Sequence, residues 1–327
     1  MKYRKFSDLG WNVSEVGLGC WQIGWCWGDV SERDARDLLN KAIDKGINFF
    51  DTSDTYGDGR SERFLSEILK STSEKIYVST KVGRRVRGTD YPKGYKHKHI
   101  EEFIDRSLKN LNIDSIDLLQ LHCPPSDLCS KAETYQVMDE IVKKGKIKNY
   151  GVSVHKISDA MEAIKFPNVK SIQIVFNIFR QKPAEEFFKE AKKRKIGVIV
   201  RGPLASGLLT GSINKDTKFP ENDHRNYNIS GSAFDIGDTF SGVDFKKGLE
   251  AVSRIKKLKP KHISLSELAL KWILSHDAVS VVIPGAVNKS QVEINANSSS
   301  LEDISNIIPK INSIYDELIK KDVHDRW

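Results

Sequence analysis

The sequence of 327 residues predicts an α/β protein, a (β/α)8 barrel with an N-terminal β-hairpin and an extra C-terminal helix. Three observations predict this class. Short runs rich in valine and isoleucine alternate with longer segments of helical period, there are eight such runs, and the composition does not shift along the chain. Parallel strands that are covered on both faces have this apolar character. We therefore expect one barrel domain over residues 1–327.

The strands are expected in order from the N-terminus. Residues 3–6 and 13–16 flank a turn at 9–12 and should form a hairpin that closes the floor of the barrel. The doubly wound alternative usually has G-x-G-x-x-G after its first strand, and here the third glycine is missing. The eight barrel strands are expected at 16–19, 48–51, 76–80, 116–122, 147–154, 171–176, 197–201 and 279–284.

Helices are expected between these strands, with recognisable starts and stops. Ser31 followed by Asp34 resembles a capping box, and Gly46 is a helix stop. Residues 203–243 are too long for an ordinary connection, so we expect a functional or mobile, lid-like loop. The helices are expected at 32–45, 62–70, 100–111, 132–144, 158–165, 184–194, 266–276, 290–297 and about 301–320.

Composition excludes several classes of function. The net charge of +8 comes from lysines scattered over expected helix faces, which favours a solvated surface over a nucleic-acid partner. No apolar run reaches the ~20 residues that cross a bilayer, and the N-terminus lacks a signal-peptide core. The four cysteines have no zinc-ligand spacing, so we expect no metal, reduced thiols and a cytoplasmic location.

Ionisable residues end three consecutive expected strands. Asp51, Lys81 and His122 take these positions, and Tyr56 follows Asp51 by five residues. Active-site residues of such barrels lie at the carboxyl ends of the strands. An ammonium beside a phenol stabilises the phenolate and should lower the pKa of Tyr56, while Asp51 should hold Lys81 charged. With His122 orienting a carbonyl oxygen, this set is suited to protonating a carbonyl.

These residues resemble the aldo-keto reductase family. Asp51, Tyr56, Lys81 and His122 match its Asp–Tyr–Lys–His tetrad, and the segments at 50–69, 118–124 and 151–154 are specific to it. The resemblance implies an extended nicotinamide cofactor, usually NADPH with NAD also possible, and a small-molecule carbonyl substrate. It also implies hydride transfer from the nicotinamide C4 while the tyrosine supplies a proton.

The resemblance also assigns cofactor positions. Residues after the first strand should lie near the nicotinamide, residues of the fifth and sixth strands should hold its carboxamide, the segment at 202–211 should wrap the pyrophosphate, and the strand-8 loop with the following helix start should meet the 2′-phosphate. The implied residues are Gly19, Cys20, Trp21, Asp51, Ser153, Gln173, Arg201, Gly202, Pro203, Leu204, Ala205, Gly207, Leu209, Gly285, Ala286, Val287, Lys289, Gln291 and Asn295.

The sequence departs from the family pattern at three positions. Arg201 stands where many members have a tyrosine stacked on the nicotinamide, and a guanidinium can also stack. Ile294 replaces a glutamate that often contacts adenine, and Val287 replaces an arginine that often faces the 2′-phosphate. Lys289 and Gln291 remain as contacts to that phosphate, so NADP is favoured and NAD stays open.

The substrate pocket and two alternative functions complete the predictions. Trp21, Trp25 and Trp27 could cover a sugar or a small carbonyl compound, and Arg84, Arg85 and Arg87 could meet an anionic group or merely face solvent. Lys81 could instead form a Schiff base, as in an aldolase. Barrels that resemble this family also serve as cofactor-sensing potassium-channel subunits. The oligomeric state is not predicted.

Overall fold

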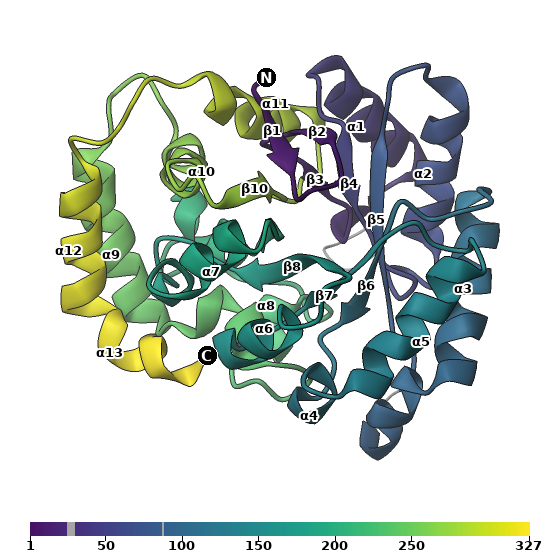
Figure 1. Ribbon diagram of the computed structural model, residues 1–327. Helices are drawn as coiled ribbons and strands as arrows, with labels where there is room; N and C mark the ends of the chain where they lie inside the picture. The colour runs from purple at the N-terminus through teal and green to yellow at the C-terminus, as the bar shows by residue number, and fades with distance from the viewer. Residues whose placement is uncertain (25–29, 87) are drawn as a thin grey trace.

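The computed structural model describes residues 1–24, 30–86 and 88–327 and is built around a barrel of eight parallel strands (Figure 1). Bridges from Val16 to Val282 and from Gly19 to Gly285 join the first barrel strand to the last. The predicted (β/α)8 barrel is confirmed. Its strands are β3 (Leu18–Gly19), β4 (Phe49–Asp51), β5 (Tyr77–Val82), β6 (Leu118–His122), β7 (Tyr150–Ser153), β8 (Val169–Val175), β9 (Gly197–Arg201) and β10 (Val279–Val282).

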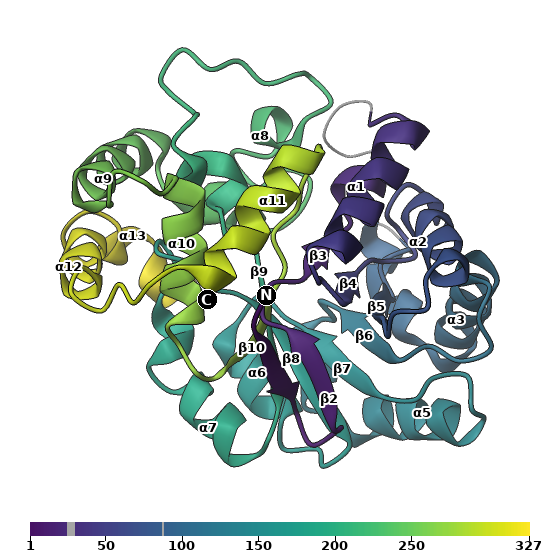
Figure 2. The same cartoon turned by 90° about the horizontal axis from the view of Figure 1, so that it is seen from above.

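An antiparallel hairpin of β1 (Tyr3–Phe6) and β2 (Trp11–Ser14) covers one end of the barrel (Figure 2). Phe6 and Val13 are fully buried and form a cluster with Phe49 and Tyr77, the first residues of β4 and β5. The hairpin therefore closes the amino-terminal end of the strands, as predicted. The opposite end, where active sites form, is left to the loops.

Helices surround the barrel and pack their apolar stripes on it. Those that follow the barrel strands are α1 (Glu32–Asp44), α2 (Arg60–Ser71), α3 (His97–Leu111), α5 (Ala132–Lys143), α6 (Ile157–Ala163), α7 (Phe187–Lys193), α10 (Leu265–Leu274) and α11 (Lys289–Asn297). In α1, the Ser31 side chain caps the helix by accepting from the backbone N–H of Asp34, as expected. Its buried face consists of Ala35, Leu38, Leu39 and Ala42.

The largest differences from the predicted helices are near the C-terminus and after residue 244. The C-terminal helix begins at Ile308 rather than near 301, because Pro309 is tolerated only in a first helical turn; α12 (Ile308–Leu318) is then followed by α13 (Lys320–Val323). An additional helix, α9 (Phe245–Leu258), was not predicted and is capped by Asp244. Figure 2 shows α9 and α12 side by side outside α10.

The long segment 203–243 forms short helical turns over the carboxyl ends of the strands. These are η4 (Ala205–Thr210), α8 (His224–Tyr227), η5 (Ile236–Asp238) and η6 (Phe240–Gly242); the remaining short helices are η1 (Gln22–Gly24), η2 (Gly88–Tyr95), α4 (Ser126–Cys129), η3 (Lys182–Ala184), η7 (Ser298–Ser300) and η8 (His324–Arg326). Within the described ranges, no helix has the length and apolar character to span a bilayer.

The hairpin generates a stability prediction. Phe6→Ala should lower the free energy of unfolding by about 3–5 kcal/mol, because it leaves a cavity between the hairpin and the barrel floor. The exposed Tyr3 on the same strand is a matched control, and Tyr3→Ala should cost less than about 1 kcal/mol. Urea unfolding followed by circular dichroism measures both values. Equal losses for the two variants would contradict a buried hairpin.

Candidate active site

The predicted polar residues lie at or near the carboxyl ends of neighbouring strands. Asp51 pairs with Ser79, Lys81 with Gln120, His122 with Ser153, and Ser153 with Gln173. Because neighbouring parallel strands end together, these side chains converge at the carboxyl end of the barrel. Tyr56 reaches the same place from the loop after β4. Its backbone packs against Gly24 of η1, where an added Cβ would lie 2.7 Å from the Cβ of Tyr56.

A buried ion pair between Lys81 and Asp51 lies at the centre of this region. The side chains are 1% and 4% exposed. Lys81 Nζ also donates to the carbonyl oxygen of Thr52 at 2.7 Å and to the Tyr56 hydroxyl at 3.3 Å. Burial alone would lower the pKa of Lys81, but Asp51 and Tyr56 outweigh it and the pKa is raised. The ammonium is therefore fixed in place and stays charged.

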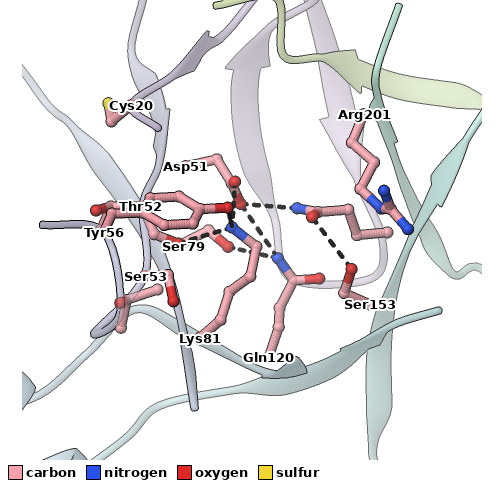
Figure 3. A network of polar contacts seen from close by, with 12 residues as sticks. Cys20, Asp51, Thr52, Ser53, Tyr56, Ser79, Lys81, Gln120, Ser153 and Arg201 are labelled. Atoms are coloured by element: carbon pink, nitrogen blue, oxygen red, sulfur yellow. Dashed lines mark hydrogen bonds and ion pairs between the residues drawn. The ribbon is translucent and has the colours of Figure 1, made fainter. Parts of the chain in front are cut away.

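Two glutamine side chains also form hydrogen bonds with the Asp51 carboxylate (Figure 3). Gln173 Nε2 donates to Asp51 Oδ2 at 2.7 Å. Gln120 Nε2 lies 3.4 Å from the same oxygen and donates to Ser79 Oγ at 2.7 Å. Sequence reasoning missed Gln120, which lies two residues before His122 inside an apolar strand. A fully buried amide at that position was the available signal.

The Tyr56 phenol is held by Lys81 but is not made more acidic than a free tyrosine. Burial is the largest effect and raises the pKa of Tyr56, and the positive charge of Lys81 opposes this only in part. The expectation of a lowered pKa is therefore not met in this structure. The phenol stays protonated at neutral pH, as a proton donor must.

His122 is neutral at physiological pH. Its pKa is held well below the usual value, first by burial and then by the charges of Arg84, Lys81 and Arg201. Its Nδ1 lies 3.2 Å from Ser53 Oγ, and its ring meets the Tyr56 ring edge-on at 6.1 Å. The imidazole thus has one proton and can offer a hydrogen bond without adding positive charge.

Arg201 belongs to a second polar cluster beside His122. Its guanidinium forms an ion pair with Asp238 from η5 and donates to the carbonyl oxygen of Val154 and to His155 Nδ1, each at 3.1 Å. Cys123 Sγ lies 3.9 Å from Arg201 Nη2. Burial would raise the pKa of Cys123, but the interactions with His155, Arg201 and Arg84 outweigh it and lower the pKa to about 6. Sequence reasoning missed Asp238, His155 and Cys123. Asp238 comes from the long segment 203–243, whereas Cys123 and His155 follow within two residues the ends of the neighbouring strands β6 and β7, a position that could have indicated them.

The predicted cofactor positions at Ser153, Gln173 and η4 lie at the end of β7, within β8 and after β9, which are neighbouring strands. Ser153 Oγ donates to Gln173 Oε1 at 3.2 Å, so the predicted carboxamide pair is in contact. In η4, Ala205, Ser206 and Gly207 have φ of 47°, 53° and 98°. The N–H groups of Ala205 and Gly207 donate to the carbonyl oxygens of Gly202 and Leu204, so this turn is closed by its own backbone hydrogen bonds.

The strand-8 loop and α11 place the remaining cofactor positions. Asn288 caps α11, Gln291 Oε1 accepts from the N–H of Val287, and Asn295 donates to the carbonyl oxygen of Gly285. Lys289 is exposed in the first turn and pairs with Asp37 at 3.2 Å. The Gln291 side-chain oxygen is thus used within the loop, and Lys289 is the residue whose positive charge is accessible to solvent.

Of the other residues predicted to line the substrate pocket, some lie beside the site and others contact residues elsewhere. The Trp21 ring lies 6.4 Å from that of Tyr56 and 5.1 Å from that of His224 in α8, so it borders the site. Arg85 points to Asp58 and the Asp54 carbonyl, away from the pocket, whereas Arg84 lies near Cys123 and Tyr91. Trp25, Trp27 and Arg87 lie outside the described residues.

Comparison with known proteins agrees with this geometry. The model of the aldo/keto reductase family matches residues 15–316. The aldo-keto reductase YhdN of Bacillus subtilis is 30% identical over 320 residues, 94% of each chain. A probable voltage-gated potassium channel subunit beta of Arabidopsis thaliana is 30% identical over 90% of each chain. The solved glycerol dehydrogenase AKR11B4 of Gluconobacter oxydans superposes with a TM-score of 0.79 at 26% identity, covering 100% of this chain and 97% of its own. The chain therefore belongs to the aldo/keto reductase family.

Proposed function

We propose that this protein is an NADP(H)-dependent reductase that converts a small aldehyde or ketone to an alcohol in the cytoplasm. The observation that supports it most is the contact of Lys81 with both Asp51 and Tyr56, beside a neutral His122. This set presents a protonated phenol and a neutral hydrogen-bond donor to one point. A carbonyl oxygen that becomes an alkoxide needs both. The unpaired thiols of Cys20, Cys123 and Cys129 favour a reducing compartment.

The residues present fit a nicotinamide cofactor. Gly285 lets the Gln22 side-chain amide pack directly against the strand-8 loop, since an added Cβ would lie 2.1 Å from that amide. Gln22 Oε1 and Arg201 Nε are buried without a partner in the described structure and are available to a ligand. Ser153 and Gln173 would hold the carboxamide, η4 the pyrophosphate, and Lys289 the 2′-phosphate. When bound, the reduced cofactor supplies a hydride from C4.

The chain's own groups supply the remaining chemistry. Tyr56 holds the proton that the product oxygen needs, and Lys81 stabilises the phenolate that remains. Asp51 keeps Lys81 charged and in position. His122 orients the carbonyl oxygen and adds no competing positive charge. Trp21 borders the space where a small substrate would lie.

The structure disfavours the aldolase alternative. A Schiff-base lysine must lose its proton to act as a nucleophile, which requires a lowered pKa. Lys81 has a raised pKa and is held by Asp51, Thr52 and Tyr56. The cofactor-sensing alternative is favoured by the 30% identity to the channel subunit and is separated from the reductase by turnover.

The proposal is tested by substituting the proton donor. Tyr56→Phe should lower kcat for aldehyde reduction about 10²–10⁴-fold, because it removes the phenolic proton but keeps the ring. Loss of NADPH absorbance over a panel of aldehydes measures kcat, and NADH in parallel measures cofactor preference. Tyr135→Phe, whose hydroxyl donates to the Cys129 carbonyl outside the barrel, is the matched control and should change kcat less than about twofold.

Two outcomes would overturn parts of this proposal. A wild type no faster than Tyr56→Phe on every carbonyl, with NADPH binding seen by tryptophan fluorescence, would favour the cofactor-sensing function. A kcat/KM for NADH equal to or above that for NADPH would reject the assignment of Lys289 to the 2′-phosphate.

A further inference from the structure

Ser53 has one hydroxyl proton and several polar neighbours that compete for it. Its Oγ lies 3.1 Å from Asp54 Oδ1, 3.2 Å from His122 Nδ1 and 3.0 Å from Thr55 Oγ1. A hydroxyl donates one hydrogen bond, so Ser53 cannot donate to Asp54 and to His122 at once. The choice between these two partners decides whether His122 Nδ1 accepts or donates.

Asp54 is an unusual carboxyl group because it is fully buried and incompletely partnered. Its Oδ2 has no hydrogen-bond donor among the described residues. Glu62 from α2 adds a second carboxylate nearby, while Arg85 from the loop after β5 and Arg106 from α3 add positive charge. Burial and Glu62 outweigh the arginines and raise the pKa of Asp54 to about 7.

The two buried carboxyl groups of Asp54 and Glu62 differ in their hydrogen-bond donors. Glu62 is also buried, but Thr80 Oγ1 and Asn110 Nδ2 donate to its two oxygens at 2.7 and 2.8 Å. Asp54 Oδ2 has no such donor among the described residues, so the ionised form of Asp54 lacks hydrogen bonds that would stabilise a buried carboxylate. With a pKa near 7, Asp54 therefore changes its protonation state close to neutral pH.

The two forms of Asp54 give two arrangements of the same three residues. Ionised Asp54 is the stronger acceptor, so the Ser53 hydroxyl donates its hydrogen bond to Asp54. Ser53 Oγ then accepts a hydrogen bond from His122 Nδ1. Because His122 is neutral, its Nε2 is then bare. Protonated Asp54 donates to Ser53, Ser53 donates to His122 Nδ1, and the single imidazole proton sits on Nε2.

We propose that Asp54 is a positioning residue that acts through Ser53 to set which ring nitrogen of His122 holds the proton. This inference rests on the proposed function, in which His122 meets the substrate oxygen. With the proton on Nε2, His122 donates to a carbonyl oxygen and supports reduction. With Nε2 unprotonated, His122 accepts a hydrogen bond from the hydroxyl of an alcohol, which favours binding of the alcohol over the carbonyl compound. The relay therefore links the direction of reaction to pH.

The test follows the ring nitrogens of His122 directly. In protein labelled with ¹⁵N-histidine, the His122 signals are assigned by their loss in His122→Asn and recorded from pH 6 to pH 8.5. In the wild type we expect the proton to move from Nε2 to Nδ1 with a midpoint near pH 7. Asp54→Asn keeps the shape of the side chain but cannot titrate, so the tautomer should stop changing over this range. Ser53→Ala should abolish the change as well.

Kinetics supply the second readout. Wild-type kcat/KM for aldehyde reduction should fall about tenfold per pH unit above about pH 7, and Asp54→Asn should remove this fall up to at least pH 8.5. The matched control is Asp58→Asn, which alters an exposed acid in the same loop that pairs with Arg85 and Arg106. Because this variant removes the charge that neutralises both arginines, the midpoint should shift to lower pH while the transition itself remains.

The outcomes separate this inference from the proposed function. A His122 tautomer that is constant in the wild type, or a transition that persists in Asp54→Asn, would overturn the relay whatever the activity. A transition that is present in the spectra of a protein that reduces no carbonyl compound would support the relay's geometry and reject the reductase function. If Asp54→Asn does not fold, Ser53→Ala decides the point alone.

Discussion

The buried ion pair of Lys81 and Asp51 is the interaction on which the rest of the active end of the barrel depends. Removing two charges from water costs several kcal/mol per ion, and mutual attraction repays this only when the other hydrogen-bonding positions are satisfied. The protein meets that condition with the Thr52 carbonyl, Gln173 and Gln120. Four of the eight barrel strands contribute to it, since β4 and β5 supply the ion pair and β6 and β8 supply the two glutamines.

This pair also sets the electrostatics of the groups around it. The fixed ammonium opposes the effect of burial on Tyr56 and contributes to keeping His122 neutral. Its charge is balanced by Asp51, whereas Arg201 is balanced separately by Asp238. Proton donation by Tyr56 and orientation by His122 are therefore two consequences of one buried arrangement.

Local patterns predicted much of this structure, and long-range contacts account for what they missed. The strand ends gave Asp51, Lys81 and His122, and the Ser31 cap predicted the start of α1. Asp238 could not be expected beside Arg201, because 36 intervening residues of irregular chain place it there. The direction of the Tyr56 pKa shift also depends on how deeply the ring is buried, which spacing along the sequence does not show. Likewise, Ser53 and Asp54 lie in the same motif as Asp51 and Tyr56, but the contact of Ser53 with His122 joins residues that follow or end different strands.

A double-mutant cycle between Asp51→Asn and Lys81→Met tests the central role of the ion pair most directly. Each single variant leaves one buried partner uncompensated, so each should lower the free energy of unfolding by about 3–5 kcal/mol. The double variant removes both charges and should be at least 2 kcal/mol more stable than the sum of the single losses predicts. Denaturant unfolding measures all four proteins. Losses that add within about 0.5 kcal/mol would contradict the account, because they would show that the two side chains stabilise the barrel independently.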